Sequence, residues 1–246
     1  MSSLQKLDTI LYEVQQASLQ LSLPSPQGVY DSADENVLLM GSVANLAGIM
    51  VAEAFDWQHL RKTFTAVGDG VKKAFDLPTD FSRFVDGTGW SSAIRRPIQV
   101  LNPQQWATLK AWMSPVTIVP VCRILADQLN FLTAPAVGDT ITIEYVDANW
   151  VIDGTIASPV TYKQKLTVNA DIPRFDWLLM VLAVKLKWLE LKGLSTASVQ
   201  SDFNDRLQQL TQRDEMGQAL TLAGPIPGGF RYLDAISNTR DSGFGS

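Results

Sequence analysis

The chain has 246 residues and a formal net charge of −5 at pH 7. Charged residues make up only 18% of it and hydrophobic residues 46%, with 7 Trp and 10 Phe. A chain of this length buries a sizeable core, in one large domain or in two closely packed ones. The acidic balance excludes a general nucleic-acid binder, which carries a basic stripe to neutralise phosphates. The small share of charge favours an oligomer, because apolar patches left on a surface mark interfaces.

The single cysteine and the apolar segments indicate which cellular compartment the sequence suits. Cys122 is the only cysteine, which excludes an intramolecular disulfide and suits a reducing compartment. It lies in an apolar run and is predicted to be a buried strand thiol. The first residues mix charges and predict no signal peptide. Residues 36–52 and 177–184 are predicted to be buried helices, since the first contains polar residues and glycines and the second is shorter than the roughly 20 residues of a membrane span.

The N-terminal part is predicted to be helical. Apolar residues recur every three or four positions over residues 4–21, which predicts an amphipathic helix that the prolines of residues 23–28 end. A second helix begins near Ser32 or Asp34, either of which is a good cap, and runs to between residues 57 and 60. Along it, three small residues four apart predict a groove for another helix: Ala44, Gly48 and Ala52.

After residue 60 the apolar period changes to two, which is typical of strands. Residues 63–67 and 71–75 flank Gly68-Asp69-Gly70, a hairpin signal. Turns are predicted at 77–80 and 86–89, and a short helix begins at Asn102-Pro103. Further strands are predicted at 119–125, 128–132, 140–145 and 161–168.

The helix predicted over residues 175–191 is apolar on two seams and must be mostly buried. Lys192 and Gly193 predict its end. A last helix is capped by Ser195 or Thr196 and runs to about Arg213. Its apolar face is Val199, Phe203, Leu207 and Leu210.

These elements predict an α+β fold. An antiparallel helical bundle is formed by residues 1–60 and 172–216, and a mainly antiparallel β-rich unit with a short helix is inserted at 61–171. The stretch over residues 56–90 is the joint between the two. The residues predicted to form this joint are Trp57, His59, Pro78, Asp80 and Trp90.

Residues 217–246 are predicted to form an extended C-terminal arm. Glycine and proline punctuate this segment, so it cannot hold a helix. It nevertheless carries more large side chains than a purely disordered linker does. The arm either orders on a partner or folds back on its own domain. Its candidate binding residues are Phe230, Arg231, Tyr232, Leu233, Ile236 and Phe244.

Candidate catalytic chemistry rests on very few residues. His59 is the only histidine, so a Ser-His-Asp or Cys-His arrangement would depend on it alone. Its position after Trp57 at a helix end instead predicts a hydrogen-bonded structural residue. The sequence contains no G-x-S-x-G, no G-x-x-x-x-G-K-[ST] and no full dinucleotide fingerprint. We therefore predict no catalytic residue and no cofactor.

No metal site is predicted either, because there are no His or Cys clusters and no calcium-loop pattern. Paired carboxylates for glycoside chemistry stay open, but nothing singles out two of them. Arg95 and Arg96 could face phosphates, although a solvated turn or a subunit salt bridge explains them better. The tryptophans lack interleaved basic residues, which favours core or interface roles over stacking on nucleic acid or sugar. Acidic residues of the β-rich region mostly lie beside Gly or Pro as turn formers: Asp76, Asp80, Asp86, Asp139, Asp147 and Asp153.

Four stretches carry a resemblance over most of residues 30–210. They are Phe55-Asp56-Trp57-Gln58-His59-Leu60-Arg61; the turn at 77–81 leading to Val85-Asp86-Gly87-Thr88-Gly89-Trp90; the strand at 140–145 followed by Asn149-Trp150-Val151; and the helix at 177–193 with Lys187-Trp188-Leu189. In this order they resemble the head-to-tail adaptor family of tailed bacteriophages, including the tail tubular protein A type of short-tailed phages. The resemblance rests on order, and none of the stretches is a catalytic signature.

The resemblance implies a non-enzymatic ring protein of about twelve copies, located in the virion between the portal and the tail and made in the host cytoplasm. It implies a portal-binding role for the arm and a platform on the β-rich unit for the downstream tail or nozzle protein. DNA would only pass through the channel, and no membrane is involved. Two rivals remain: another ring component of the tail, such as a stopper or tail terminator, and a hydrolase with an unrecognised acidic pair.

Overall fold

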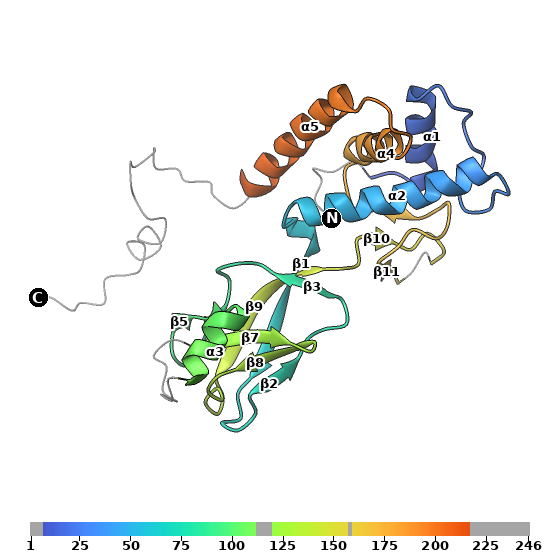
Figure 1. The fold of residues 1–246 in the computed structure, drawn as a ribbon. Helices are drawn as coiled ribbons and strands as arrows, with labels where there is room; N and C mark the ends of the chain where they lie inside the picture. Colours follow the sequence, from blue (N-terminus) through green and yellow to red (C-terminus); the bar gives the residue numbers. More distant parts are fainter. Residues whose placement is uncertain (1–6, 112–119, 157–158, 217–246) are drawn as a thin grey trace, which may run out of the picture.

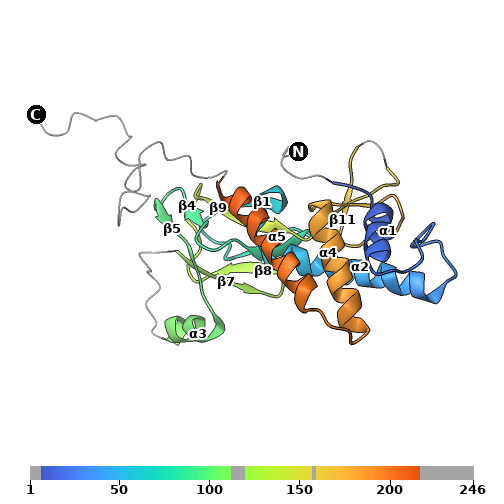
Figure 2. The same ribbon diagram turned by 90° about the horizontal axis from the view of Figure 1, so that it is seen from above.

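The computed structural model describes residues 7–111, 120–156 and 159–216. Helices pack together at one end of the molecule and a β-rich unit projects from them (Figure 1). The helical layer consists of α1 (Ile10–Gln20), α2 (Glu35–Ala54), α4 (Trp177–Leu191) and α5 (Ala197–Met216). Helix α4 lies between α1 and α5 in both views (Figures 1 and 2). The predicted α+β class is therefore confirmed, whereas the predicted arm at 217–246 lies outside the described residues.

Side-chain caps define the ends of the helices. The hydroxyl of Thr9 accepts from the Tyr12 amide and begins α1, so the helix starts later than residue 4, where the periodicity places it. Asp34 accepts from the Asn36 amide at 2.9 Å and begins α2, as predicted. Asp176 caps α4 in the same way. Gly193, with a φ of 65°, ends α4 in the left-handed conformation that its missing Cβ permits.

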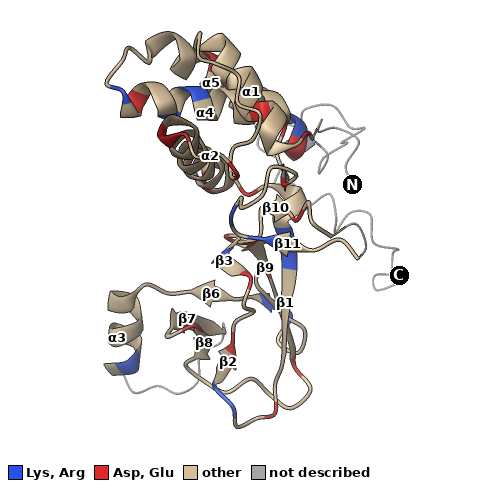
Figure 3. Ribbon diagram, turned by 90° about the vertical axis from the view of Figure 1, so that its right-hand side faces the viewer, with Lys and Arg blue, Asp and Glu red and all other residues tan. Residues whose placement is uncertain are grey.

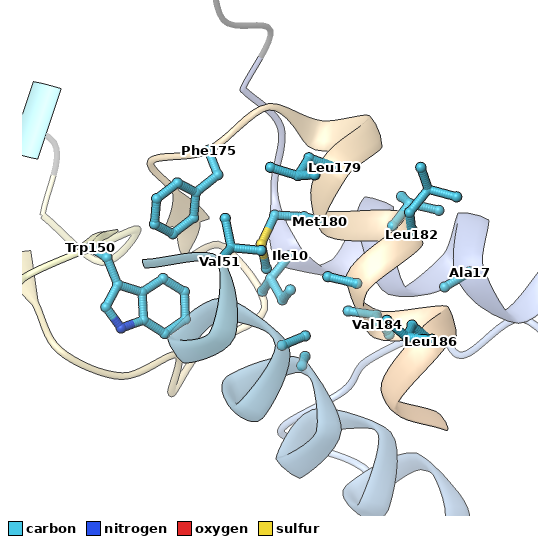
Figure 4. Close-up of a cluster of buried hydrophobic side chains, with 14 of the residues drawn as sticks. Ile10, Ala17, Val51, Trp150, Phe175, Leu179, Met180, Leu182, Val184 and Leu186 are labelled. Atoms are coloured by element: carbon cyan, nitrogen blue, oxygen red, sulfur yellow. The ribbon is translucent and has the colours of Figure 1, made fainter. Parts of the chain in front are cut away.

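The helical layer has its own hydrophobic core, with α4 at its centre. Leu179 and Met180 are fully buried, and Ile10 and Ala17 of α1 pack towards α4 (Figure 4). This explains why α4 is apolar on two seams, as the sequence indicates. The core also takes up Trp150, Val151 and Leu166, which the sequence places in the β-rich unit.

At Gly48, the groove predicted along α2 is filled by an aromatic side chain. A Cβ added to Gly48 would lie 2.1 Å from a ring carbon of Trp150. The indole of Trp150 therefore occupies the space at Gly48, where the sequence predicts another helix. Glycine is required here because any side chain would displace the ring.

The β-rich unit is built on the antiparallel pair β1 (Arg61–Val67) and β9 (Thr140–Asp147), whose register runs from Arg61 opposite Val146 to Val67 opposite Thr140. The other side of β9 pairs with β3 (Phe81–Phe84) and β4 (Trp90–Ser91), and β4 continues to β5 (Arg96–Pro97). A second sheet has the order β2 (Ala74–Asp76), β8 (Gln128–Phe131), β7 (Val121–Leu125) and β6 (Gln99–Val100). Only β6 and β7 are parallel among the described pairs.

The smaller elements complete the fold. The 3-10 helix η1 (Gln58–Leu60) links α2 to β1, and α3 (Pro103–Ala111) lies beside the second sheet (Figure 1). Asn102 and Gln105 exchange amide-to-side-chain hydrogen bonds at the start of α3, as its capping sequence predicts. A third sheet joins β10 (Val151–Ile152) to β11 (Tyr162–Lys163) and β12 (Ile172–Pro173). The two larger sheets enclose a second core: Phe64, Ala66, Phe75, Ile98, Cys122, Leu129, Phe131, Ile141, Ile143 and Tyr145.

The hairpin predicted over residues 63–75 is wrong. Strand β1 pairs with β9, and β2 pairs with β8. The Asp69 carboxylate accepts from the amides of Val71 and Lys72, which turns the chain away from β1. The strand predicted at 161–168 is shorter than expected, because the amides of Thr167 and Val168 donate to Asp171 instead of to a sheet.

Candidate functional site at the joint

The joint is the region where η1, β1, β3 and the end of β9 meet the helical layer. Of the residues predicted for it, Trp57, His59 and Asp80 are brought together around this region. Pro78 lies in the adjoining turn, where its carbonyl accepts from the Phe81 amide at 3.0 Å. Trp90 is the exception, because it lies on β4 opposite Thr142, far along β9 from the joint, and is 41% exposed.

Trp57 and His59 form the aromatic side of the joint. The Trp57 indole donates to the Val51 carbonyl at 2.8 Å, which binds it to α2. Its ring centroid lies 5.9 Å from that of Phe175 and 6.0 Å from that of His59. Burial, together with the charge of Arg174, lowers the pKa of His59 to about 4. His59 is therefore neutral at physiological pH and is poorly suited to exchange protons there.

Lys62, at the start of β1, is the centre of an ionic cluster. Its ammonium contacts the carboxylates of Asp80 and Asp147, the latter at 2.8 Å, and the Asp147 side chain is completely buried. Desolvation lowers the pKa of Lys62, but its hydrogen bonds to these carboxylates and their charges outweigh this and raise the pKa above its ordinary value. Tyr145 donates to Asp80 at 3.1 Å, and burial together with Asp80 raises the pKa of Tyr145 to about 12.

Arg174 connects four parts of the chain. Its guanidinium donates to the carbonyl of His59 and, at 3.1 Å, to that of Asn149. It lies 3.5 Å from the Asp147 carboxylate and 4.6 Å above the ring of Tyr162. A planar guanidinium suits this role because its donors are fixed in direction. Arg174 thus ties the segment before α4 to η1, to β11 and to the end of β9.

Arg83 fastens β3 to the end of α2. It pairs with Asp56 at 2.8 Å and donates to the Phe55 carbonyl at 3.0 Å and the Ala52 carbonyl at 3.3 Å. These are among the carbonyls that a helix leaves unpaired at its end. Helix α2 ends at Ala54, before the predicted end, and Phe55 after it is extended. The Gln58 amide also donates to the Asp214 carboxylate at 2.8 Å, which attaches the end of α5.

Both signs of charge therefore alternate where β1 and β3 reach the helices (Figure 3). Asp80 is predicted for the joint from the sequence, but most of the charged residues around it are not. Lys62 and Asp147 are adjacent because β1 and β9 are antiparallel, and nothing local to either residue indicates that pairing. The joint residues not predicted from the sequence are Lys62, Arg83, Tyr145, Asp147 and Arg174, of which Asp147 was predicted only as a turn former.

The charged groups of the joint are paired with one another: Lys62 and Arg174 with Asp147, and Arg83 with Asp56. Cys122 is buried on β7, and burial raises the pKa of its thiol to about 12. Within residues 7–111, 120–156 and 159–216, no three His, Cys, Asp or Glu side chains converge as metal ligands. Asp139, in the wall of a hollow of about 180 Å³, is already bonded to Ser91 and Ser92.

A second candidate surface lies on the outer side of α2. No charged residue occurs between Glu35 and Glu53, although part of this stretch faces solvent. We name as the α2 stripe Leu38, Leu46 and Ile49, which are 48%, 56% and 39% exposed. Helix α2 is long and apolar enough to cross a membrane, with a mean hydropathy of 1.7, a property that core helices of soluble proteins share. Its inner face packs in the helical core, which leaves the α2 stripe available to a partner.

Comparison with protein-family models and with curated proteins finds no match to this chain. Function is therefore inferred from the fold, the joint and the α2 stripe.

Proposed function

We propose that this protein is a structural component of a virion, a head-to-tail adaptor of tailed bacteriophages. It forms a ring of about twelve copies between the portal and the tail and leaves a channel for DNA. The order of elements supports this proposal, since a helical layer carries an inserted β-rich unit and the quoted stretches fall at the joint, on β9 and on α4. The proposed role is assembly, without catalysis, cofactor or membrane.

The α2 stripe is the observation that carries the proposal. An exposed helix face normally carries charge, and this one carries none over residues 36–52. Leucine and isoleucine side chains exposed in a row favour contact with another protein surface. In a ring, each copy repeats the same contact with the next, so that the α2 stripe is buried all the way around.

Besides contacts around the ring, an adaptor requires a rigid attachment for its platform, and we assign this role to the joint. A platform for the next tail component must be held at a fixed orientation to the ring. The contacts of Lys62, Arg83 and Arg174 attach the β-rich unit to the helices at several points. We assign the β-rich unit to the downstream tail or nozzle protein. The portal is assigned to the arm, whose residues Phe230 and Tyr232 lie outside the described part of the chain.

The test replaces Leu46 by lysine. Light scattering measures the mass of the protein alone and mixed with the portal of the same virus. Wild-type protein is expected to give a large complex with the portal, and Leu46→Lys to reduce its assembly at least about tenfold, because a lysine would be buried without a partner. Leu125→Lys is the matched control, since Leu125 is 53% exposed on β7 of the β-rich unit.

Equal assembly of Leu46→Lys and wild type would exclude the α2 stripe from the ring. If wild-type protein never associates with the portal, the adaptor assignment fails. Association with a downstream tail component alone would instead identify a stopper or a tail terminator.

A further inference from the structure

Glu13 lies on the face by which α1 docks. Ile10 precedes it by three residues and Ala17 follows it by four, so the three side chains share one side of the helix. All three are fully buried, and Ile10 and Ala17 pack towards α4 (Figure 4). Among the described residues, neither carboxyl oxygen of Glu13 has a hydrogen-bond partner. The docked face of α1 therefore contains one ionisable group that has lost its water and gained no partner.

The charged groups around Glu13 oppose its ionisation. Burial raises the pKa of Glu13 well above its usual value, and the charges of Asp8, ahead of α1, and Asp176, at the start of α4, raise it further. Asp176 is itself paired with Arg206 of α5 at 2.9 Å. Helix α2, which also packs on α1, carries no charge between its first residue and Glu53. The docked position of α1 thus favours the protonated form of Glu13.

Few polar contacts hold α1 in place. The Ile10 amide donates to the Asp171 carbonyl at 2.8 Å, and the Tyr12 ring lies 6.1 Å from that of Trp177. The Asp171 carboxylate is paired elsewhere, with Lys163 at 2.8 Å. None of the ion pairs between described residues involves α1. The attachment of α1 therefore depends mainly on the burial of its inner face.

The chain that follows α1 is anchored independently of it. Val29 is fully buried, and its amide donates to the side chain of Asn169 at 2.7 Å. Ahead of this anchor, the Gln15 side chain donates to the Pro26 carbonyl at 2.8 Å, so residues 9–26 are bound to each other. They form a unit that can separate from α4 while the chain from Val29 onwards stays in place.

We propose that α1 is a proton-controlled segment of the fold. It docks on α4 while Glu13 is protonated, and it separates as a unit when Glu13 ionises, because a carboxylate requires the water that the docked face excludes. Helix α4 keeps its contacts with α2 and α5, so the rest of the helical layer stays folded. Separation uncovers the apolar side of α4 that α1 covers. This property of α1 is independent of any role in a virion.

The direction of the response follows from proton binding. The docked state holds the proton of Glu13 more tightly than the released state, in which water solvates the carboxylate. Docking is therefore strongest below the pKa of the released state and weakens as pH rises towards the pKa of the docked state. One proton limits the change to about tenfold in the docking equilibrium per pH unit.

The experiment measures hydrogen exchange of the full chain at about pH 5 and about pH 8, with and without low concentrations of urea. Protection is compared after correction for the intrinsic exchange rate, which itself rises with pH. Release of α1 alone exposes little surface, so exchange through it changes little with urea, whereas exchange through global unfolding accelerates. Glu13→Gln removes the titration and Glu13→Met also removes the buried polar group. Glu53→Gln, at an exposed position of α2, is the matched control.

Wild-type α1 amides are expected to lose protection at least about tenfold between the lower and the higher pH, through an opening that urea hardly affects. At the higher pH they should be at least about tenfold less protected than the interior amides of α4. Glu13→Gln and Glu13→Met should abolish the pH response, and Glu53→Gln should retain it.

Three results would overturn the proposal. The first is a protection of the α1 amides that is the same at both pH values. The second is exchange of α1 and α4 with equal protection and equal urea dependence, which would show that the helical layer opens only as a whole. The third is a pH response that survives in both Glu13 variants.

Discussion

Glu13 is a buried acid whose replacement should stabilise the protein. Its side chain is fully buried in α1, and neither carboxyl oxygen has a hydrogen-bond partner in the part of the chain that the structure describes. Burial raises the pKa of Glu13 well above its usual value, and the charges of Asp8 and Asp176 raise it further. Asp176 itself is paired with Arg206 at 2.9 Å.

The sign of the pH dependence follows from this raised pKa. The folded state holds the proton more tightly than the unfolded chain, so unfolding releases a proton between the two pKa values. Wild-type stability is therefore highest below the unfolded pKa and falls as pH rises towards the folded one. One proton gives a slope of at most about 1.4 kcal/mol per pH unit.

Glu13→Met is expected to raise the free energy of unfolding by about 2–4 kcal/mol at neutral pH. An unsatisfied buried polar group costs about 1–3 kcal/mol, and the added apolar burial contributes roughly 1 kcal/mol more. Glu13→Gln is the matched comparison, because it loses the titration but keeps a buried polar group. Urea unfolding at several pH values is followed by the fluorescence of the tryptophans in the helical core: Trp57, Trp150 and Trp188.

Two results would refute this reasoning. One is a wild-type free energy of unfolding that does not change from acid to neutral pH, together with variants that are no more stable than wild type. The other is a Glu13→Met protein that is less stable than wild type at neutral pH, which would show that the carboxylate has a stabilising partner.

Two further substitutions test the packing of the helical layer and the joint. Gly48→Ala should lower the free energy of unfolding by about 1–3 kcal/mol in urea titrations, because the added Cβ would meet Trp150 at 2.1 Å. Asp147→Asn should lower it by about 1–3 kcal/mol, since Lys62 loses a buried partner but is itself partly exposed and screened by solvent.

Each of these has a control on an exposed position. Ser42→Ala, on the outer face of α2, should change stability little, as should Asp86→Asn in its exposed turn. Equal effects of Gly48→Ala and Ser42→Ala would contradict the packing of the indole. A stable Asp147→Asn protein would show that the ionic cluster contributes nothing to the joint.

Local signals made the helices predictable. Asp34 begins α2 and Gly193 ends α4, each through a backbone preference that acts within a few residues. The two apolar seams of α4 likewise indicate burial without any knowledge of its neighbours. The face of α5 with Val199, Phe203 and Leu210 is buried for the same reason.

Long-range pairing was not predictable in this way. The turn at Asp69 looks like a hairpin because glycine flanks it, yet the side-chain bonds of Asp69 direct the chain to another sheet. The ionic cluster of Lys62 and Asp147 depends on the register of β1 with β9, which no local pattern specifies. The space at Gly48 was recognised as a groove, but its occupant, Trp150, comes from a distant loop.

The measurement that tests the central proposal most directly is electron cryomicroscopy of the purified virus particle. The account predicts a ring of about twelve copies of this fold directly beneath the portal, with the α2 stripe buried between neighbours and the β-rich unit against the next tail component. It would be contradicted by a particle that contains no such ring at the head–tail junction, or by a ring in which the α2 stripe faces solvent.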